Sequence, residues 1–483
     1  MTRSFRLSTF GIALLLAPAI GFAQDAPRPK PMTQVPKANN SIRIPYEKYT
    51  LPNGLTVILS QDKSAPTVAV NMAYHVGSKN EVLGRTGFAH LFEHVMFTGS
   101  GHVPYGFHDK FTEGVGGNNN GGTSYDETSY YENVPANYVE HALWMEADRM
   151  GWLLDALDTA KYNAQRSIVQ QERKQRVDNV PFGMAREIML ANMYPSTNPY
   201  SWDVIGHLAD LQAAPVDAVK EFFRQYYAPN NATVAIVGDF DPATTKALVA
   251  KHFGEIPKGK PIVRPKVAPV TLADEKRLTF EDKGVTSSPR LFITWPTVSS
   301  HSDDQYPLDV LRSVLTGSRT ARLTKELVYD RQLAANVGGG QSTLEDAGQF
   351  AITITPRPNV SLTQLELITD SILDRLKRDG PTAEEVARAK AGAELSFISG
   401  LESNLGKASA LASDQAYFGD PSHSFTVDYP RAQAVTAADV KRVAIKYLGK
   451  GRIVLSVVPV GQKDKASKPE ASKVVTGTEG GTR

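Results

Sequence analysis

The segment that decides both the fold and the chemistry of this chain is Gly84-Arg-Thr-Gly-Phe-Ala-His-Leu-Phe-Glu-His-Val-Met-Phe-Thr-Gly-Ser100. Its apolar residues recur at helical spacing between two glycines, which predicts a short buried helix. On that helix His90 and His94 project from one face, one turn apart. Two imidazoles in this arrangement suit one zinc ion, which takes nitrogen, sulfur or carboxylate ligands. Glu93 lies at the edge of the same face, where it can accept a proton from a water molecule at the metal.

A zinc site on this helix needs a third protein ligand from elsewhere in the chain. The sequence contains no cysteine, so this ligand has to be His, Asp or Glu. Glu172 is a candidate, because it lies in a charged but helix-compatible run that follows Ser167. Without the upstream motif, Glu172 would be interpreted as a solvated surface carboxylate, since its neighbours are polar.

The His-x-x-Glu-His pattern is the inverted zinc motif of the inverzincin metallopeptidases. Together with Glu172 it resembles the pitrilysin/insulinase family, which includes the mitochondrial processing peptidase and bacterial proteins like it. The stretch Leu51-Pro-Asn-Gly-Leu-Thr-Val-Ile-Leu59 resembles the opening strand of that family. The resemblance implies zinc as the cofactor, with His90, His94 and Glu172 as its ligands and Glu93 as the general base.

The resemblance also implies an α+β fold built from two homologous domains, each a mainly antiparallel sheet with helices packed on one side, forming a clamshell. The strand patterns agree with a repeat, because the strand expected at residues 289–295 corresponds to the strand expected at 67–76. The second copy can be overlaid on the zinc motif. On that overlay, His90, Glu93 and His94 are replaced by Asp309, Arg312 and Ser313, in that order. A zinc site is therefore not expected in the second half.

Residues 1–23 have the pattern of an export signal. Arg3 and Arg6 give a positive start, residues 11–20 are apolar, and the small residues before Gln24 suit cleavage after Ala23. The apolar run is too short to span a bilayer, so no membrane anchor is expected. The predicted location is the periplasm or the exterior of the cell.

Changes in composition divide the rest of the chain. Proline and basic residues are frequent after residue 258 and indicate an extended linker, whereas the last residues are rich in Lys, Ser, Gly and Thr. The expected segments are a Pro-rich linker at 24–40, a zinc-bearing catalytic domain at 41–257, a linker at 258–275, a degenerate second domain at 276–462 and a disordered tail at 463–483.

The stretch from Gly116 to Tyr131 combines Gly and Asn with alternating Thr, Tyr and Ser. Composition alone favours a mobile polar loop. The resemblance instead favours an edge strand that receives an extended substrate as an added strand, with Asn120, Gly121 and Thr123 contacting the peptide. His102 and His108, in the glycine-rich stretch before it, are expected to be solvated loop residues.

Two positions depart from the family pattern. Gln165 stands where relatives often carry a second glutamate, seven residues before the third ligand. Ala335 stands where the degenerate half commonly presents a tyrosine that, with an arginine, holds the substrate and the transition state. Arg322 or Arg331 is a candidate replacement for the arginine, but alanine cannot donate a hydrogen bond to an oxyanion. A homologous partner subunit, in a heterodimer or a homodimer, is therefore expected to supply what is missing.

The 53 basic and 51 acidic residues leave a formal charge of +2, which gives no reason to expect nucleic acid as a partner. Two hypotheses about function follow. The first is a zinc metalloendopeptidase acting on extended peptides or unfolded polypeptide segments. The alternative is a non-catalytic peptide-binding or assembly subunit of a heterodimer with a structural metal site. Three protein ligands favour the first, because structural zinc sites normally have four.

Overall fold

The computed structural model describes residues 42–300 and 302–477. The strands of the first half are β1 (Glu47–Thr50), β2 (Thr56–Gln61), β3 (Thr67–Tyr74), β4 (Asn118–Thr123), β5 (Thr128–Pro135) and β6 (Ala232–Gly238). Its helices are α1 (Phe88–Val95), α2 (Phe107–Gly114), α3 (Val139–Ala156), α4 (Thr159–Arg173), α5 (Ala185–Met193), α6 (Leu208–Ala213), α7 (Val216–Tyr226) and α8 (Pro242–Phe253). Short helical turns are η1 (Ser78–Asn80), η2 (Ala136–Tyr138), η3 (Lys174–Asp178) and η4 (Pro229–Asn231).

The second half follows a stretch at 258–275 without helix or strand. Its strands are β7 (Lys276–Asp282), β8 (Arg290–Thr297), β9 (Ala334–Thr343), β10 (Gly348–Pro356), β11 (Ile453–Pro459) and β12 (Lys473–Val475). Its helices are α9 (Gln305–Thr316), α10 (Leu362–Asp379), α11 (Ala383–Gly400), α12 (Asn404–Phe418), α13 (Tyr429–Ala434) and α14 (Ala437–Tyr447). Short helical turns are η5 (Thr324–Asp330), η6 (Ser424–Asp428), η7 (Lys463–Lys465) and η8 (Pro469–Ala471).

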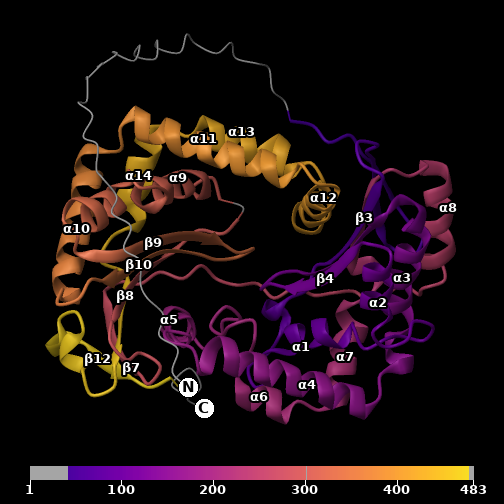
Figure 1. The fold of residues 1–483 in the computed structure, drawn as a ribbon, viewed down its shortest axis with the longest axis horizontal. Coiled ribbons are helices and arrows are strands. Elements are labelled where there is room, and N and C mark those ends of the chain that lie inside the picture. Colours follow the sequence, from indigo (N-terminus) through magenta and orange to yellow (C-terminus); the bar gives the residue numbers. More distant parts are fainter. Residues whose placement is uncertain (1–41, 301, 478–483) are drawn as a thin grey trace, which may run out of the picture. The chain divides into compact units, whose positions relative to one another are not determined.

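The two halves repeat one topology. Their strands form two six-stranded sheets with the orders β1-β2-β6-β3-β5-β4 and β12-β7-β11-β8-β10-β9 (Figure 1). Neighbouring strands are antiparallel except for the pairs β2–β6, β7–β11 and β7–β12. The predicted α+β class with two homologous, mainly antiparallel sheets is confirmed. In this repeat α1 corresponds to α9 and α4 corresponds to α11.

Each sheet receives one helix from the other half. Helix α12 lies against β3 and β6 of the first sheet, on the face away from α3 (Figure 1). There Asn71 Nδ2 donates to Ser409 Oγ over 3.1 Å, and Asn404 Nδ2 donates to the carbonyl of Thr67 over 3.1 Å. In return, α5 packs on β11, and the Thr294 hydroxyl approaches Met189 Sδ at 3.3 Å. Since α5 and α12 occupy equivalent places in the repeat, the exchange is reciprocal.

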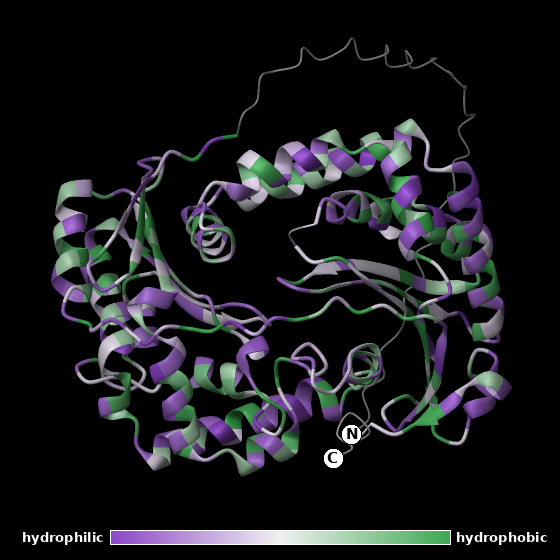
Figure 2. Cartoon of the chain, turned by 180° about the vertical axis from the view of Figure 1, so that it is seen from behind, coloured by the Kyte–Doolittle hydropathy of each residue, from purple (hydrophilic) through white to green (hydrophobic). Residues whose placement is uncertain are grey.

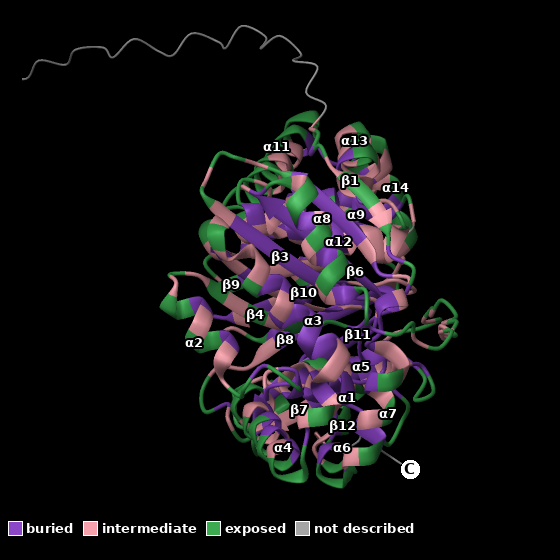
Figure 3. Cartoon of the chain, turned by 90° about the vertical axis from the view of Figure 1, so that its right-hand side faces the viewer, coloured by how far each residue is buried: buried purple, intermediate pink, exposed green. Residues whose placement is uncertain are grey.

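The hydrophobic core has one cluster in each half and a third that joins them. The joining cluster contains residues of α5, such as Ile188, and residues of β11, such as Leu455, both buried. The peripheral helices carry both hydrophilic and hydrophobic residues (Figure 2). The central strands β3 and β6 are almost entirely buried (Figure 3), as expected for strands covered on both faces.

The turns of the two edge hairpins meet. Lys79, which is 4% exposed, lies 2.9 Å from Glu345 Oε2 and also contacts Asp346. The Glu345 amide donates to Asp126 Oδ2 over 2.9 Å. These contacts join the β9–β10 turn of the second half to the β4–β5 turn of the first, so the ends of the edge strands β4 and β9 are held close together.

The predicted disordered tail from residue 463 is wrong for residues 463–477. Strand β12 pairs in parallel with β7, whose outer edge would otherwise leave its backbone groups without partners. Val475 is 4% exposed, and the buried Ser467 amide donates to Ser456 Oγ over 3.0 Å. The segment is ordered because this edge supplies hydrogen bonds that its composition does not reveal. No helix between residues 42 and 477 is both long and apolar enough to cross a membrane.

Candidate metal centre

Helix α1 forms as predicted and turns its apolar face to the core, where Phe88, Leu91, Phe92 and Val95 are buried. His90 and His94 lie on the remaining face, with their ring centroids 4.9 Å apart. Their side chains are 12% and 22% exposed. The helix thus keeps both imidazoles in place while leaving them accessible from one side.

Glu172 of α4 closes the site. Its Oε2 atom lies 3.6 Å from His90 Nε2 and 3.2 Å from His94 Nε2. Tetrahedral ligands about 2.1 Å from a zinc ion stand about 3.4 Å apart, so the three donor atoms fit one zinc ion. Among the residues that the structure describes, this is the only group of three or more His, Cys, Asp or Glu side chains arranged for a metal. The site therefore combines residues from two separate helices.

Two arginines fix the end of α4. The buried Arg173 donates to Glu187 Oε2 over 2.8 Å and to the carbonyl of Gly206. The helix then widens into the π-helical turn η3, a distortion often found at functional sites. From this turn Arg176 reaches back to Glu172 Oε1 at 2.5 Å. One carboxylate oxygen of Glu172 thus faces the histidines while the other is held by an arginine.

The electrostatics favour the protonation states that bind a metal. Burial holds the pKa of His90 below its ordinary value, so this imidazole is neutral near pH 7. The hydrogen bond from His94 lowers the pKa of Glu172. A metal ligand has to be a neutral imidazole or an ionised carboxylate. Glu93 is half-buried on the same helix, next to His94.

The stretch from Gly116 to Tyr131 is a hairpin rather than a single strand. Its first strand, β4, is the last strand of the first sheet and pairs only with β5 among the described strands. Asn120, Gly121 and Thr123 all lie on β4, and Asn120 Oδ1 accepts a hydrogen bond from the Gly121 amide. A Cβ atom on Gly121 would lie 2.9 Å from the Tyr130 ring. Glycine therefore lets β4 pack closely against Tyr130 of β5.

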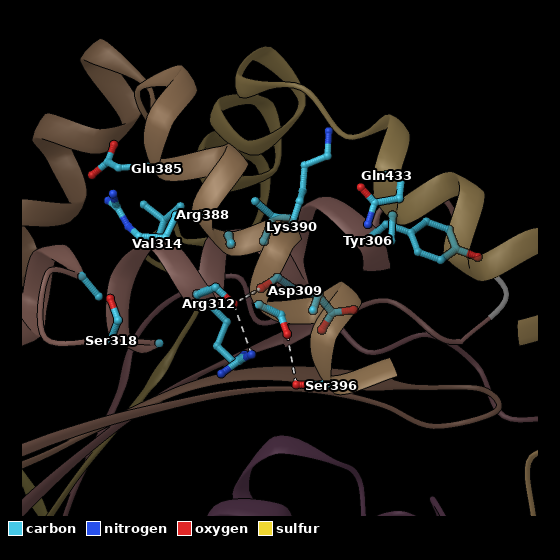
Figure 4. A pocket seen from close by; sticks show the side chains of 18 residues that line it. Tyr306, Asp309, Arg312, Val314, Ser318, Glu385, Arg388, Lys390, Ser396 and Gln433 are labelled. Carbon is cyan, nitrogen blue, oxygen red and sulfur yellow. Dashed lines mark hydrogen bonds between the residues drawn. The ribbon is translucent and has the colours of Figure 1, made fainter. Parts of the chain in front are cut away.

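The second half has a pocket where the first half has the candidate metal ligands. The pocket, about 660 Å³, lies between α9 and α11, and Asp309, Arg312 and Ser313 line it as the overlay predicts. Ser396 lies as many residues after the N-cap of α11 as Glu172 lies after that of α4. Arg312 and Lys390 point in different directions (Figure 4). The side chains that form the candidate metal centre in the first half are thus all replaced in the second.

The departures from the family pattern take definite places. Ala335 lies exposed on β9, and Gln165 is buried on α4. Arg322 is engaged by both oxygens of Glu385, at 2.8 and 2.7 Å. Arg331 lies 2.7 Å from a carboxylate oxygen of Glu326. Each candidate replacement for the arginine is therefore already paired with a carboxylate.

Two residues near the site were not recognised from the sequence. His108, predicted to be a solvated loop residue, is instead buried in α2, where its Nδ1 contacts Glu132 at 3.1 Å. Glu81 was not singled out at all. It is buried and bonds to the first turn of α1. The only signal in the sequence was a carboxylate before a helix that begins at a glycine. His102 is exposed, as predicted.

Comparisons with known proteins show which family this chain resembles. A family model described as "Insulinase (Peptidase family M16)" matches residues 56–199, and one described as "Peptidase M16 inactive domain" matches residues 214–393. The zinc protease PqqE of Helicobacter pylori is 29% identical over 83% of this chain and 90% of its own length. The β subunit of the mitochondrial processing peptidase of Blastocladiella emersonii is 24% identical, over 87% and 90%.

Solved structures share the fold. A protease from Helicobacter pylori superposes with a TM-score of 0.79 and 28% identity, over 86% of this chain and 99% of that one. A protein from Pseudomonas fluorescens described as a peptidase M16 inactive domain gives a TM-score of 0.74 at 20% identity, over 86% and 98%. The second likeness concerns the fold alone.

Proposed function

This chain belongs to the insulinase (M16) family of peptidases, and we propose on that basis that it is an exported zinc metalloendopeptidase. Its substrates are extended peptides or unfolded polypeptide segments. The observation that carries the proposal is the convergence of His90 Nε2, His94 Nε2 and Glu172 Oε2, at distances that suit one metal ion. Three protein ligands leave a coordination position open, as in catalytic zinc sites.

In the proposed mechanism, zinc supplies Lewis-acid polarisation when it is bound. Glu93 accepts a proton from the attacking water at its carboxylate. The water oxygen then bonds to the scissile carbonyl carbon, the carbon–nitrogen bond breaks, and Glu93 returns the proton to the leaving amine. His90 and His94 hold their places through the packed face of α1, and Arg176 holds one oxygen of Glu172.

The proposed substrate site is the free edge of β4. An extended peptide there would gain main-chain hydrogen bonds from alternate residues of the strand, and Asn120, Gly121 and Thr123 are the residues proposed to contact it. Sequence selectivity should then be loose, and stably folded proteins should resist cleavage. Peptides that carry an N-methyl group at every second residue test this idea. One methylation register should weaken binding, and the shifted register should leave it unchanged.

The proposed location is the periplasm or the exterior of the cell, with cleavage after Ala23. This proposal rests on the sequence pattern of residues 1–23, which lie outside the described residues. N-terminal sequencing of the protein recovered from its native host tests it directly, with Gln24 expected as the first residue. Recovery of the intact N-terminus from the cytoplasm would contradict it.

The alternative function is a non-catalytic subunit of a heterodimer with a structural metal site. It gains support from Ala335, which cannot donate a hydrogen bond, and from Arg322 and Arg331, which are both already paired with carboxylates. An oxyanion donor is worth about a hundred- to a thousandfold in rate. A homologous subunit that presents an arginine and a tyrosine could restore such donors.

Turnover of an unstructured peptide distinguishes these possibilities. The zinc-loaded protein is assayed alone and after mixing with a homologous subunit whose own zinc motif is degenerate. Strong turnover by the chain alone would support an independent endopeptidase, and an Ala335→Tyr variant should then change little. Turnover only in the mixture would support a catalytic subunit that needs its partner. Absence of turnover in both, with zinc bound, would contradict the proposed activity.

A further inference from the structure

The N-terminus of α1 is capped by a residue outside the helix. The N-cap is Gly87, which has no side chain and adopts a left-handed conformation with φ +84°. The first amides of a helix need acceptors, and Glu81 supplies them. Its Oε2 atom accepts from the Gly87 amide over 3.0 Å, and its Oε1 atom accepts from the Ala89 amide over 2.8 Å. Both carboxylate oxygens therefore hold the start of the helix.

Glu81 is held in turn by the loop that follows α5. Trp202 Nε1 donates to Glu81 Oε2 over 3.0 Å, and both side chains are buried. Burial raises the pKa of Glu81 to about 8 against these hydrogen bonds, so its carboxylate is costly to keep here. A buried carboxylate that bonds both to the start of α1 and to this loop fixes the relative position of the two.

The same loop contacts the other ligand-bearing helix. A Cβ atom on Gly206 would lie 2.3 Å from the Gly87 Cα atom, so the two backbones are in direct contact. The His207 amide donates to Thr86 Oγ1 over 2.8 Å. From α4, Arg173 donates to the carbonyl of Gly206. Residues 202–207, which we call the clasp, therefore touch the start of α1 and the residue next to Glu172.

We propose that Glu81 is a positioning residue of the metal centre. Together with the clasp, it sets the distance between α1, which carries His90 and His94, and the end of α4, which carries Glu172. The inference rests on the proposed zinc site. A metal site tolerates errors of only a few tenths of an ångström in its ligands. Ala89 directly precedes His90, so a shift at the first turn moves the ligands.

The test measures zinc affinity rather than activity. In Glu81→Gln, the side-chain NH₂ group replaces one of the two acceptor oxygens and faces a backbone N–H donor. Two donors cannot bond to each other, so the start of α1 has to move. We expect the zinc dissociation constant, from competition with a chelator, to rise about tenfold or more, by analogy with groups that orient metal ligands directly. The absorption bands of bound Co²⁺, which report ligand geometry, should also change. Asp414→Asn is the matched control, because Asp414 is a buried carboxylate that accepts the Ser424 amide in the second half.

A second pair of variants tests the clasp without touching Glu81. Gly206→Ala would push against Gly87, whereas Gly84→Ala carries the same strain of a positive φ but meets no atom within 4 Å. We expect weaker zinc binding in the first variant only. The pair also keeps the inference testable if Glu81→Gln does not fold.

The outcomes separate this inference from the proposed function. Absence of zinc binding by the wild-type protein would overturn the metal site itself. Unchanged zinc affinity and Co²⁺ spectra in a folded Glu81→Gln protein with a lowered melting temperature would show that Glu81 is only a structural cap. Equal losses of zinc affinity in Gly206→Ala and Gly84→Ala would overturn the role of the clasp.

Discussion

His94 Nε2 lies 3.2 Å from Glu172 Oε2, although the two residues come from helices that are far apart in the sequence. The contact needs no metal to form, because a histidine and a carboxylate attract each other at this distance. It nevertheless places two donors where a third, His90 Nε2, completes a ligand set. Glu93 does not belong to this set of donor atoms, so mutations can distinguish metal binding from proton transfer.

The first prediction separates metal binding from proton transfer. Alanine in place of His90, His94 or Glu172 should remove most of the bound zinc. Glu93→Gln should keep the zinc and lower peptide turnover by about 10²- to 10⁴-fold, the usual contribution of a general base. Zinc content by elemental analysis and turnover of a fluorogenic peptide are measured on the same samples. Full zinc occupancy in Glu172→Ala would remove this residue from the ligand set.

The second prediction concerns the packing of the edge strand. Gly121→Ala places a methyl group 2.9 Å from the Tyr130 ring and 3.2 Å from Phe97, so it should lower the free energy of unfolding by about 1–3 kcal/mol. Peptide turnover should fall as well, because β4 would move from its place beside α1. At Gly122 no atom lies within 4 Å, so Gly122→Ala should be neutral or stabilise by up to about 1 kcal/mol. Chemical denaturation measures both, and equal effects would argue against this packing.

A third prediction concerns pH. Glu127 accepts a hydrogen bond from Ser413 of α12, and burial raises its pKa to about 7. A carboxyl with a raised folded-state pKa contributes stability that is complete below its unfolded pKa of about 4.5 and is lost as the pH rises through 7. Asp414, also raised to about 7 by burial, acts in the same direction.

The contribution of Glu127 to the free energy of unfolding should therefore fall by roughly 1–3 kcal/mol between about pH 4.5 and 7. Glu127→Gln retains an acceptor for Ser413 but cannot ionise, so its stability relative to the wild type should rise by that amount as the pH increases from about 4.5 to 7. Urea denaturation at several pH values provides the curves, with the exposed Glu255→Gln as control. Parallel curves for Glu127→Gln and the wild type would show that ionisation of Glu127 does not affect stability.

The fourth prediction tests the ordered C-terminal strand. Val475 is 4% exposed, whereas its neighbour Val474 is 46% exposed on the same strand. Val475→Asp should lower the free energy of unfolding by about 2–4 kcal/mol, because it buries a carboxylate in the place of an apolar side chain. Val474→Asp should change it by less than about 0.5 kcal/mol. If both were neutral in thermal denaturation, β12 would contribute nothing to the fold.

The sequence predicted the repeat and indicated two of the candidate metal ligands, His90 and His94, because both features have strong local signals. The central strands carry β-branched residues in long runs, and His90, Glu93 and His94 share one turn of a short helix. Glu172 has no such signal, and its assignment came from the resemblance. The structure places it against His94 independently of that resemblance.

Other features depend on contacts between distant segments. His108 is buried in α2, where Glu132 faces it from β5. The order of residues 463–477 depends on the free edge of β7, and the reciprocal placement of α5 and α12 leaves no periodic pattern in the chain. Glu81 acquires its role from Trp202 and from the turn at Gly87. A reading of local sequence has no access to these partners.

The exchange of α5 and α12 makes the two halves a single cooperative unit. Neither sheet can be covered on both faces by its own half, so unfolding one half strips a helix from the other. The described part of the chain should therefore melt in one transition. Two fragments divided within residues 258–275 should be unstable apart and should recover structure only when they are combined. A duplicated sequence has in this way become one indivisible folding domain.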